Sequence, residues 1–338
     1  MAKMMVVVMF PLAILTAITA VDFSKSLTRY VNTDAVMDRL NFGIELGYFL
    51  TSLQKERDMS SLYASRIGTD TKRDLLLAYP ETDESLDKLS SWPVSPTNSK
   101  REFQTRERYI NHINRHRYEL DAKNLTVIAE IDYYSQDIEI FIRWMYDAVS
   151  EVDTSVIWKS LVGYQELIMA MEYVGRERGY GIYFFAVGTF RDRNHYLRFL
   201  ESQDIAKAHF ESAKQYSRAS YALFLSYLFT KNESLQEIGR MRDEVRTNNS
   251  SEPDGSIDYA KWWFANMSIY RDVMKKTQEA LTANINGMLA ANSVNDLTGM
   301  SIAGAIFVGI MFIGPLISVA VYMLTSNIQK YSISIARK

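Results

Sequence analysis

The sequence predicts an all-α protein, in which long antiparallel helices form one or two stacked helical bundles flanked by two transmembrane helices. Three observations support this fold class. Glycine and proline, which interrupt helices, are scarce, with 15 and 6 among 338 residues. No segment alternates apolar and polar residues for long enough to form a sheet. Two uncharged apolar runs, residues 4–21 and 297–329, approach or exceed the roughly 20 residues that cross a bilayer.

The first apolar run lies between Lys3 and Asp22. Its length fits a thin membrane span, which gives a transmembrane helix over residues 1–23. The same residues fit a signal peptide, because Lys3 precedes the apolar stretch and Ala20 stands near a plausible cleavage point. From the residues alone the two alternatives are equal.

The second apolar run is the stronger candidate for a membrane helix, expected over residues 297–326, because it exceeds the length that a bilayer needs. Ser301, Ala305 and Gly309 recur at intervals of four and share one helix face. Small residues on one face let two helices approach closely, so we expect a parallel homodimer. Small residues are also common in membrane helices in general, and that alternative stays open.

Basic residues flank both runs on the side of the chain ends: Lys3 before the first, and Lys330, Arg337 and Lys338 after the second. Because basic flanks favour the cytoplasmic side, we expect a two-pass protein of the cell membrane with both termini cytoplasmic. Residues 24–296 would then form an extracellular domain. Residues 327–338 would begin a cytoplasmic linker to an output domain that is absent from this sequence.

The composition excludes several classes of site. The chain has no cysteine, so disulfides and cysteine-based metal or redox sites are excluded. The formal net charge of −2 gives no indication of nucleic-acid binding. We expect no cofactor and no metal. Five acceptor triplets for N-glycosylation agree with an extracellular location: they begin at Asn124, Asn232, Asn248, Asn249 and Asn266.

The segment between the apolar runs reads as helix almost throughout. Its clearest breaks are residues 92–96, with two prolines, and residues 248–256, with Pro253 and Gly255. The helices expected around these breaks cover about 24–67, 100–151, 154–192 and 201–230, with a last one from about 257 toward the second apolar run. Long helices with short connections pack as antiparallel bundles.

Two charged motifs, residues 53–60 and 175–181, place arginines on the apolar faces of their helices. Arg57 lies in helical register with Leu46, Leu50 and Leu53. Arg178 lies in the same relation to Leu161, Tyr164, Ile168 and Met171. A guanidinium that faces the core needs an anion, because leaving it unpaired costs several kcal/mol.

Two sources of that anion are open. One is an internal ion pair, for which the candidate carboxylates are Glu56, Glu139, Glu172 and Glu177. The other is a bound ligand held between two helices. The planar fork of arginine suits a planar oxyanion such as a carboxylate or nitrate.

Several motifs in order along the chain resemble the nitrate- and nitrite-sensing (NIT) domain family. Residues 47–66 resemble its opening helix and residues 82–86 its second helix. Residues 164–190, with Glu172, the Arg176-Glu177-Arg178 run and Gly188-Thr189-Phe190, resemble a later core helix. Trp262 or Trp263 stands where the family begins its last helix before the membrane. A membrane segment with an internal proline, here Pro11, commonly precedes this domain, which favours an uncleaved first span.

The resemblance implies an all-helical extracytoplasmic sensor that binds nitrate or nitrite through arginines. Such domains occur on bacterial kinases, chemotaxis receptors and antiterminators, and on receptor-type guanylate cyclases of invertebrates, which this chain resembles most. Arg57 and Arg178 match the motif arginines, with Arg176 and Lys55 as neighbours. Asp58 departs from the family pattern. A carboxylate beside the site would repel an oxyanion, so we expect weak nitrate binding or none.

The functional hypothesis is the sensory region of a transmembrane receptor for a small anion, signalling through the second membrane helix to a cytoplasmic output such as a guanylate cyclase. The alternative is a structural or adhesive membrane protein whose helical ectodomain binds a partner chain and no small molecule. No catalytic arrangement stands out in this segment. His112 and His116 have the spacing of two metal ligands on a helix, but their polar neighbours favour a solvated face.

Overall fold

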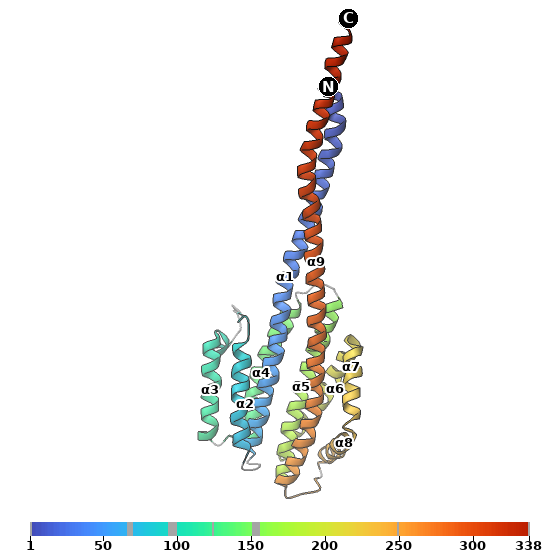
Figure 1. The fold of residues 1–338 in the computed structure, drawn as a ribbon. Helices are drawn as coiled ribbons and strands as arrows, with labels where there is room; N and C mark the ends of the chain where they lie inside the picture. Colours follow the sequence, from blue (N-terminus) through green and yellow to red (C-terminus); the bar gives the residue numbers. More distant parts are fainter. Residues whose placement is uncertain are drawn as a thin grey trace. The chain divides into compact units, whose positions relative to one another are not determined.

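The computed structural model describes residues 2–65, 70–93, 100–123, 125–150, 156–248 and 250–336, and all regular structure within them is helical (Figure 1). The all-α prediction is confirmed. The elements are α1 (Ala2–Ala64), α2 (Thr71–Asp87), η1 (Arg101–Phe103), α3 (Arg106–Lys123), α4 (Val127–Ser150), α5 (Val156–Val187), α6 (Arg193–Tyr216), α7 (Arg218–Phe229), α8 (Asn232–Thr247) and α9 (Ile257–Ala336).

The chain divides into two compact units. One contains residues 39–286, and the other combines residues 1–38 with 287–338. The first and last helices, α1 and α9, each contribute residues to both units.

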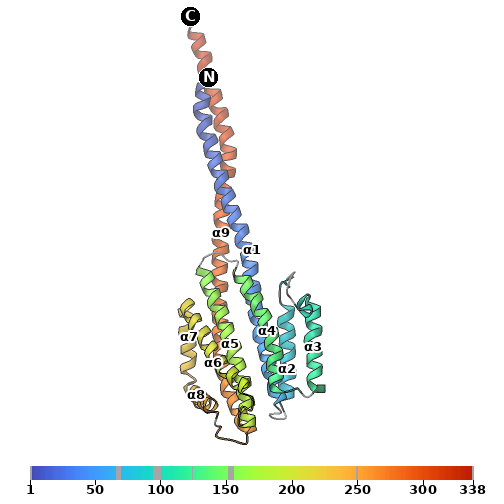
Figure 2. The same cartoon turned by 180° about the vertical axis from the view of Figure 1, so that it is seen from behind.

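In the unit of residues 39–286, segments of α1, α4, α5 and α9 lie side by side at the centre (Figures 1 and 2). Helices α2 and α3 lie on one flank, and α6, α7 and α8 lie on the other. Aromatic side chains fill the core on both flanks. Phe49, Tyr109 and Phe141 pack edge to face on the first flank, and Phe185 and Phe199 pack against Trp263 on the second.

The predicted single helix over 100–151 was wrong. The structure has η1, α3 and α4 there, and α4 begins at Val127. Thr126 explains the new start, because its hydroxyl accepts a hydrogen bond from the Ala129 amide at 3.2 Å and so caps the first turn. The charged residues before Thr126 have a helical pattern, so the start of a new helix at Val127 was not recognised in the sequence.

The predicted helix over 201–230 was also wrong as a single element. Helix α6 ends at Tyr216, and Ser217 adopts a non-helical conformation (φ −141°, ψ 83°) before α7 begins. Helix α8 was absent from the helices expected above, and α2 was expected only through the resemblance of residues 82–86 to the family's second helix. The break at 248–256 is confirmed, because Asn248 and Gly255 have φ values of +48° and +82°. Most of the predicted break at 92–96 lies outside the described residues.

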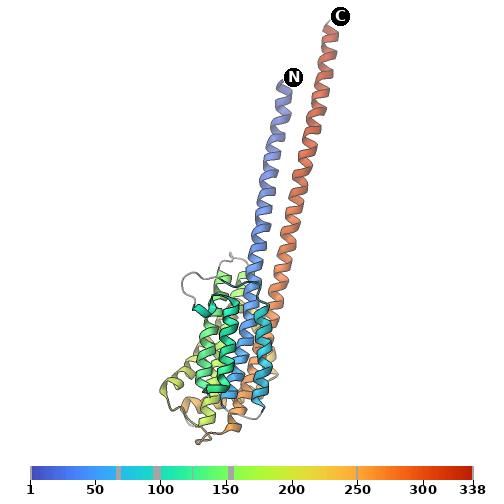
Figure 3. The same ribbon diagram turned by 90° about the vertical axis from the view of Figure 1, so that its left-hand side faces the viewer.

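The second unit contains the two apolar runs, drawn as the ends of α1 and α9 in Figure 3. Within the described residues, Val7–Val31 and Ile257–Lys330 are the two helical stretches long and apolar enough to cross a membrane. The runs contact one another. Phe23 stacks on Phe307 with ring centroids 5.8 Å apart, and a Cβ at Gly314 would lie 3.2 Å from Leu12. Their other faces expose large apolar side chains.

Candidate anion-binding site

The arginines of both charged motifs face the core, as their helical register predicts. Arg57 of α1 is 0% exposed, among Leu46, Leu50 and Leu53. Arg178 of α5 is 4% exposed. Two guanidinium groups are therefore held away from water, where each needs a negative partner.

Arg57 is anchored by three polar contacts. Its Nη1 donates to Glu172 Oε1 at 2.6 Å and to Ser135 Oγ at 3.1 Å, and its Nε lies 3.4 Å from Asp58 Oδ1. Its Nη2 is buried without a hydrogen-bond partner among the described residues. This nitrogen lies against Gly175 of α5, where an added Cβ would approach it to 2.1 Å. Glycine at 175 thus permits the close approach of Arg57 to α5.

Asp58 brings a second and a third arginine to the same place. Its Oδ2 contacts both Arg178 Nη2 and Arg271 Nη1. Arg271 comes from α9 and is 8% exposed, and Asp58 itself is 3% exposed. Three guanidinium groups, from α1, α5 and α9, thus converge on one buried carboxylate.

A cavity of about 220 Å³ opens beside this cluster, lined by residues of α1, α2, α5 and α9. Its charged lining residues are Lys55, Arg178, Arg271 and Lys275, against Glu81 and Asp272. The Nε atoms of Arg178 and Arg271 are buried and have no hydrogen-bond partner in the described part of the chain. The excess of cations and the unused donors favour an anionic occupant.

Arg176 does not join this cluster. It lines a separate cavity of about 420 Å³ between α4, α5 and α6. There its Nε donates to Glu172 Oε1 at 2.7 Å and its Nη2 to Glu139 Oε1 at 2.8 Å. That cavity has three acidic lining residues against two arginines, which disfavours a free anion.

Lys55 shares the first cavity with Arg178 but lies on its exposed rim. It forms an ion pair with Glu81 at 2.6 Å, and both side chains are nearly half exposed. Of the four residues predicted to bind the ligand, the structure therefore places Arg178 and Lys55 on one cavity. Arg57 meets Arg178 through Asp58, and Arg176 faces elsewhere.

The electrostatics keep the cluster charged. Burial lowers the pKa of Arg178 and of Arg271 to about 9, with the Arg57 cation adding to the effect and Asp272 opposing it. Both side chains remain cationic at neutral pH. Burial alone would raise the pKa of Glu172, but Arg57 and Arg176 hold it below its ordinary value, so Glu172 is a carboxylate.

Of the four carboxylates considered as internal partners, Glu172 contacts Arg57 and Glu139 contacts Arg176. Glu56 instead pairs with Arg117, and Glu177 pairs with Arg242. The internal ion pair is thus present for Arg57. For Arg178 the internal partner is Asp58, which was not among the four carboxylates considered.

Arg271 was not predicted from the sequence, and neither were the contacts of Asp58 with Arg178 and Arg271. Arg271 lies in helical register with Trp263, Met267 and Met274, all of them buried, so the pattern that identified Arg57 and Arg178 was present here too. Asp58 was expected to repel an anion. Its contacts with two arginines from other helices depend on tertiary packing, which local sequence does not show.

The interpretation of His112 and His116 as a solvated face was wrong. His116 is 7% exposed, and its Nε2 lies 3.1 Å from Glu130 Oε2. His112 Nε2 lies 3.2 Å from Asp137 Oδ2, and both rings stack on Tyr133. Among the described residues no group of three or more potential ligands could hold a metal ion.

The acceptor asparagines differ in exposure. Asn232 and Asn248 are exposed, although the side-chain oxygen of Asn248 accepts a hydrogen bond from the Phe190 amide at 3.2 Å. Asn266 is 3% exposed and donates to the Trp262 carbonyl, so it is inaccessible in the folded unit. Asn124 and Asn249 lie outside the described residues.

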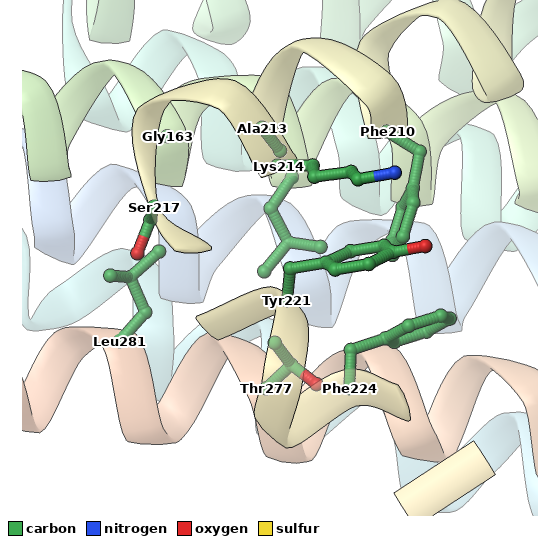
Figure 4. Close-up of a pocket in the computed structure, with 10 residues that line it drawn as sticks. Gly163, Phe210, Ala213, Lys214, Ser217, Tyr221, Phe224, Thr277 and Leu281 are labelled. Carbon is green, nitrogen blue, oxygen red and sulfur yellow. The ribbon is translucent and has the colours of Figure 1, made fainter. Parts of the chain in front are cut away.

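A further pocket, between α5, α6, α7 and α9, is apolar and small (Figure 4). Its free volume of about 20 Å³ holds no more than a water molecule. Its one cation, Lys214, lies over the Tyr221 ring at 4.6 Å from the centroid. This pocket is therefore a packing defect and not a candidate ligand site.

Two comparisons with known proteins found a match. A family model described as nitrate and nitrite sensing matches residues 49–286, more than half of the chain, and this range includes Arg57, Arg178 and Arg271. A solved structure described as that of the NasR transcription antiterminator superposes with a TM-score of 0.66 at 15% identity, covering 85% of this chain and 83% of that chain. This likeness shows a shared fold. No curated protein matches the chain at a significant level.

Proposed function

We propose that this chain, which belongs to the nitrate- and nitrite-sensing family, is the sensory region of a transmembrane receptor for a small anion. The observation that carries the proposal is the convergence of Arg57, Arg178 and Arg271 beside a cavity with an excess of cations. Guanidinium groups bind planar oxyanions through paired, charge-assisted hydrogen bonds. Nitrate, nitrite and small carboxylates are the ligands of that shape and charge.

The positions of the arginines suggest how ligand binding would act on the helices that contain the apolar runs. Arg271 lies on α9, which continues as helix to Ala336 and contains the second apolar run. Arg57 lies on α1, which contains the first. A ligand that pulls Arg271 and Arg178 together would shift α9 against α5. Small helix shifts of 1–2 Å are an established way to transmit binding.

We place a transmembrane helix over residues 1–23, the extracellular sensor domain over 24–296, a second transmembrane helix over 297–326 and a cytoplasmic linker over 327–338. Both termini are cytoplasmic, and the output is a receptor-type guanylate cyclase. Glycans would be carried by Asn232 and Asn248, the exposed acceptors among the described residues.

The alternative function, a structural or adhesive membrane protein, is favoured by one observation. Arg57 already has Glu172, and Arg178 and Arg271 already share Asp58. A cluster in which every guanidinium group is paired with a carboxylate of the same chain would bind no ligand. The two functions therefore differ in one measurable property, the saturable binding of a small anion.

Titration calorimetry on the full chain in lipid nanodiscs tests the proposal, with nitrate, nitrite, formate and chloride as probes. We expect saturable binding of at least one planar anion that is lost in Arg178→Gln and in Arg271→Gln. Each variant leaves Asp58 in contact with Arg57 and with one of the other two arginines, so the fold should persist. Arg198→Gln is the matched control, because Arg198 lines the other cavity and is 52% exposed. Binding of no anion, or binding that survives both losses, would refute the proposal.

A further inference from the structure

The Asp58 side chain stands where a bound anion would be expected in an arginine cluster. Its Oδ2 contacts Arg178 and Arg271, and its Oδ1 faces Arg57 Nε at 3.4 Å. The carboxylate is planar and shares its negative charge among its oxygens, as nitrate and nitrite do. It therefore makes the contacts that a free planar oxyanion would make.

The charges around Asp58 show why this position needs an anion. Glu172, the other buried carboxylate nearby, is shared between Arg57 and Arg176. Among the described residues, Asp58 is the one carboxylate in ion-pair contact with Arg178 or Arg271. Without it, two buried cations would face each other unpaired, which costs several kcal/mol.

We propose that the Asp58 carboxylate is a built-in anion that occupies the ligand position among Arg57, Arg178 and Arg271, so that a free anion binds only by displacing it. This inference rests on the proposed function, because it concerns the same site. A tethered carboxylate loses no translational freedom when it enters the cluster, whereas a free ion does. Only a free anion that binds the arginines tightly enough to displace the Asp58 carboxylate would therefore occupy the site.

The neighbouring cavity gives the free anion its access. Arg178 and Arg271 line that cavity as well as contacting Asp58, so an ion entering it meets the same two guanidinium groups. Lys55 and Lys275 lie on its walls and add attraction. An anion that makes these contacts can compete with the Asp58 carboxylate for Arg178 and Arg271.

In the test, the Asp58 carboxylate is removed by mutation, and the binding of a free ion at its position is measured. Asp58→Ala vacates the position, and Asp58→Asn removes the charge while filling the space. Asp272→Ala is the matched control, because Asp272 lines the same cavity and is exposed but forms no ion pair with these arginines among the described contacts. Nitrate and formate are titrated into the full chain in nanodiscs at constant ionic strength, and the melting temperature and the heat of binding are recorded.

For Asp58→Ala we expect nitrate and formate to bind at least about tenfold more tightly than to the wild type, which corresponds to about 1.4 kcal/mol. The same ions should raise its melting temperature more than that of Asp272→Ala. Asp58→Asn should gain less than Asp58→Ala, because the amide still fills the position. If Asp58→Ala folds poorly alone, nitrate or formate should restore it in a concentration-dependent way.

Two results would overturn the inference, and they distinguish failure of the role of Asp58 from failure of the proposed function. If the wild type and Asp58→Ala bind an anion equally well through Arg178, the sensor proposal stands and the role of Asp58 is refuted. If neither binds, and neither ion rescues Asp58→Ala, the anion-sensing proposal itself fails.

Discussion

Arg57 and Glu172 form an ion pair in which both side chains are shielded from water, at 0% and 1% exposure. Burying such a pair is no guarantee of stability, but removing one partner leaves an uncompensated charge. The register of Arg57 with three leucines predicted its burial, and Glu172 was among the partners considered. The choice of Glu172 over the other three carboxylates could not be predicted, because it depends on which faces of α1 and α5 meet.

Glu172→Gln tests this pair through its pH dependence. The folded-state pKa of Glu172 is lowered, so the stability that it contributes is present above the ordinary carboxyl pKa and is lost as pH falls through the folded-state value. We expect Glu172→Gln to lower the free energy of unfolding by about 3–5 kcal/mol at pH 7. The further loss of stability as the pH falls should be smaller for Glu172→Gln than for the wild type.

Denaturant unfolding of the full chain between pH 3 and pH 7 would measure both effects. Glu139→Gln is the control, because Glu139 is 56% exposed and surface pairs contribute less than about 1 kcal/mol. Equal losses from the two variants would show that the buried pair has no special role.

Gly175 makes room for Arg57, so its replacement by alanine should destabilise the chain. An added Cβ would lie 2.1 Å from Arg57 Nη2, which forces the guanidinium to move within a packed core. We expect a loss of about 1–3 kcal/mol. Gly239→Ala in α8 is the opposite control, because no atom lies within 4 Å of its added Cβ and alanine favours helix. Thermal melting should therefore move in opposite directions for the two substitutions.

At the scale of the elements, long periodic stretches were predicted well and their interruptions poorly. The long helix α5 fell close to its expected range of 154–192, although that range ran past Gly188, whose φ of +85° follows the end of the helix at Val187. The boundary between α3 and α4 was missed, because its signal is a single capping threonine. The contribution of helix caps to this chain can be tested by mutation.

Asp192 offers that test at the start of α6. Its side chain accepts a hydrogen bond from the Asn194 amide at 2.8 Å, and its backbone is extended. We expect Asp192→Ala to lower the free energy of unfolding by about 1 kcal/mol, whereas Asp192→Asn should change it little. Denaturant titration measures both variants. Equal effects would indicate that the cap contributes nothing.

At the scale of the whole molecule, the predicted homodimer requires a face of α9 that the first apolar run does not cover. Gly304 and Phe307 lie against Phe23, two residues beyond the first apolar run. Gly309 has no atom within 4 Å of its added Cβ, and Ser301 and Ala305 are exposed. The small-residue face found in the sequence is therefore free for a second copy of the chain.

Disulfide cross-linking through single introduced cysteines tests the dimer in membranes, since the native chain has no cysteine. We expect intermolecular cross-links at positions 301, 305 and 309, with little cross-linking at 304 and 307. Gly304 and Phe307 are the matched controls on the face that contacts the first apolar run. Cross-links that are equally strong on both faces would argue against this dimer.

The central claim, that the arginine cluster holds an anion, is tested most directly by locating one. Crystals of the Asp58→Ala full chain soaked in bromide would give anomalous scattering from the ion itself. The account predicts a bromide peak within hydrogen-bond distance of the Arg178 and Arg271 guanidinium groups, at the position of the wild-type Asp58 carboxylate. Bromide found elsewhere on the protein, with that position empty, would contradict it.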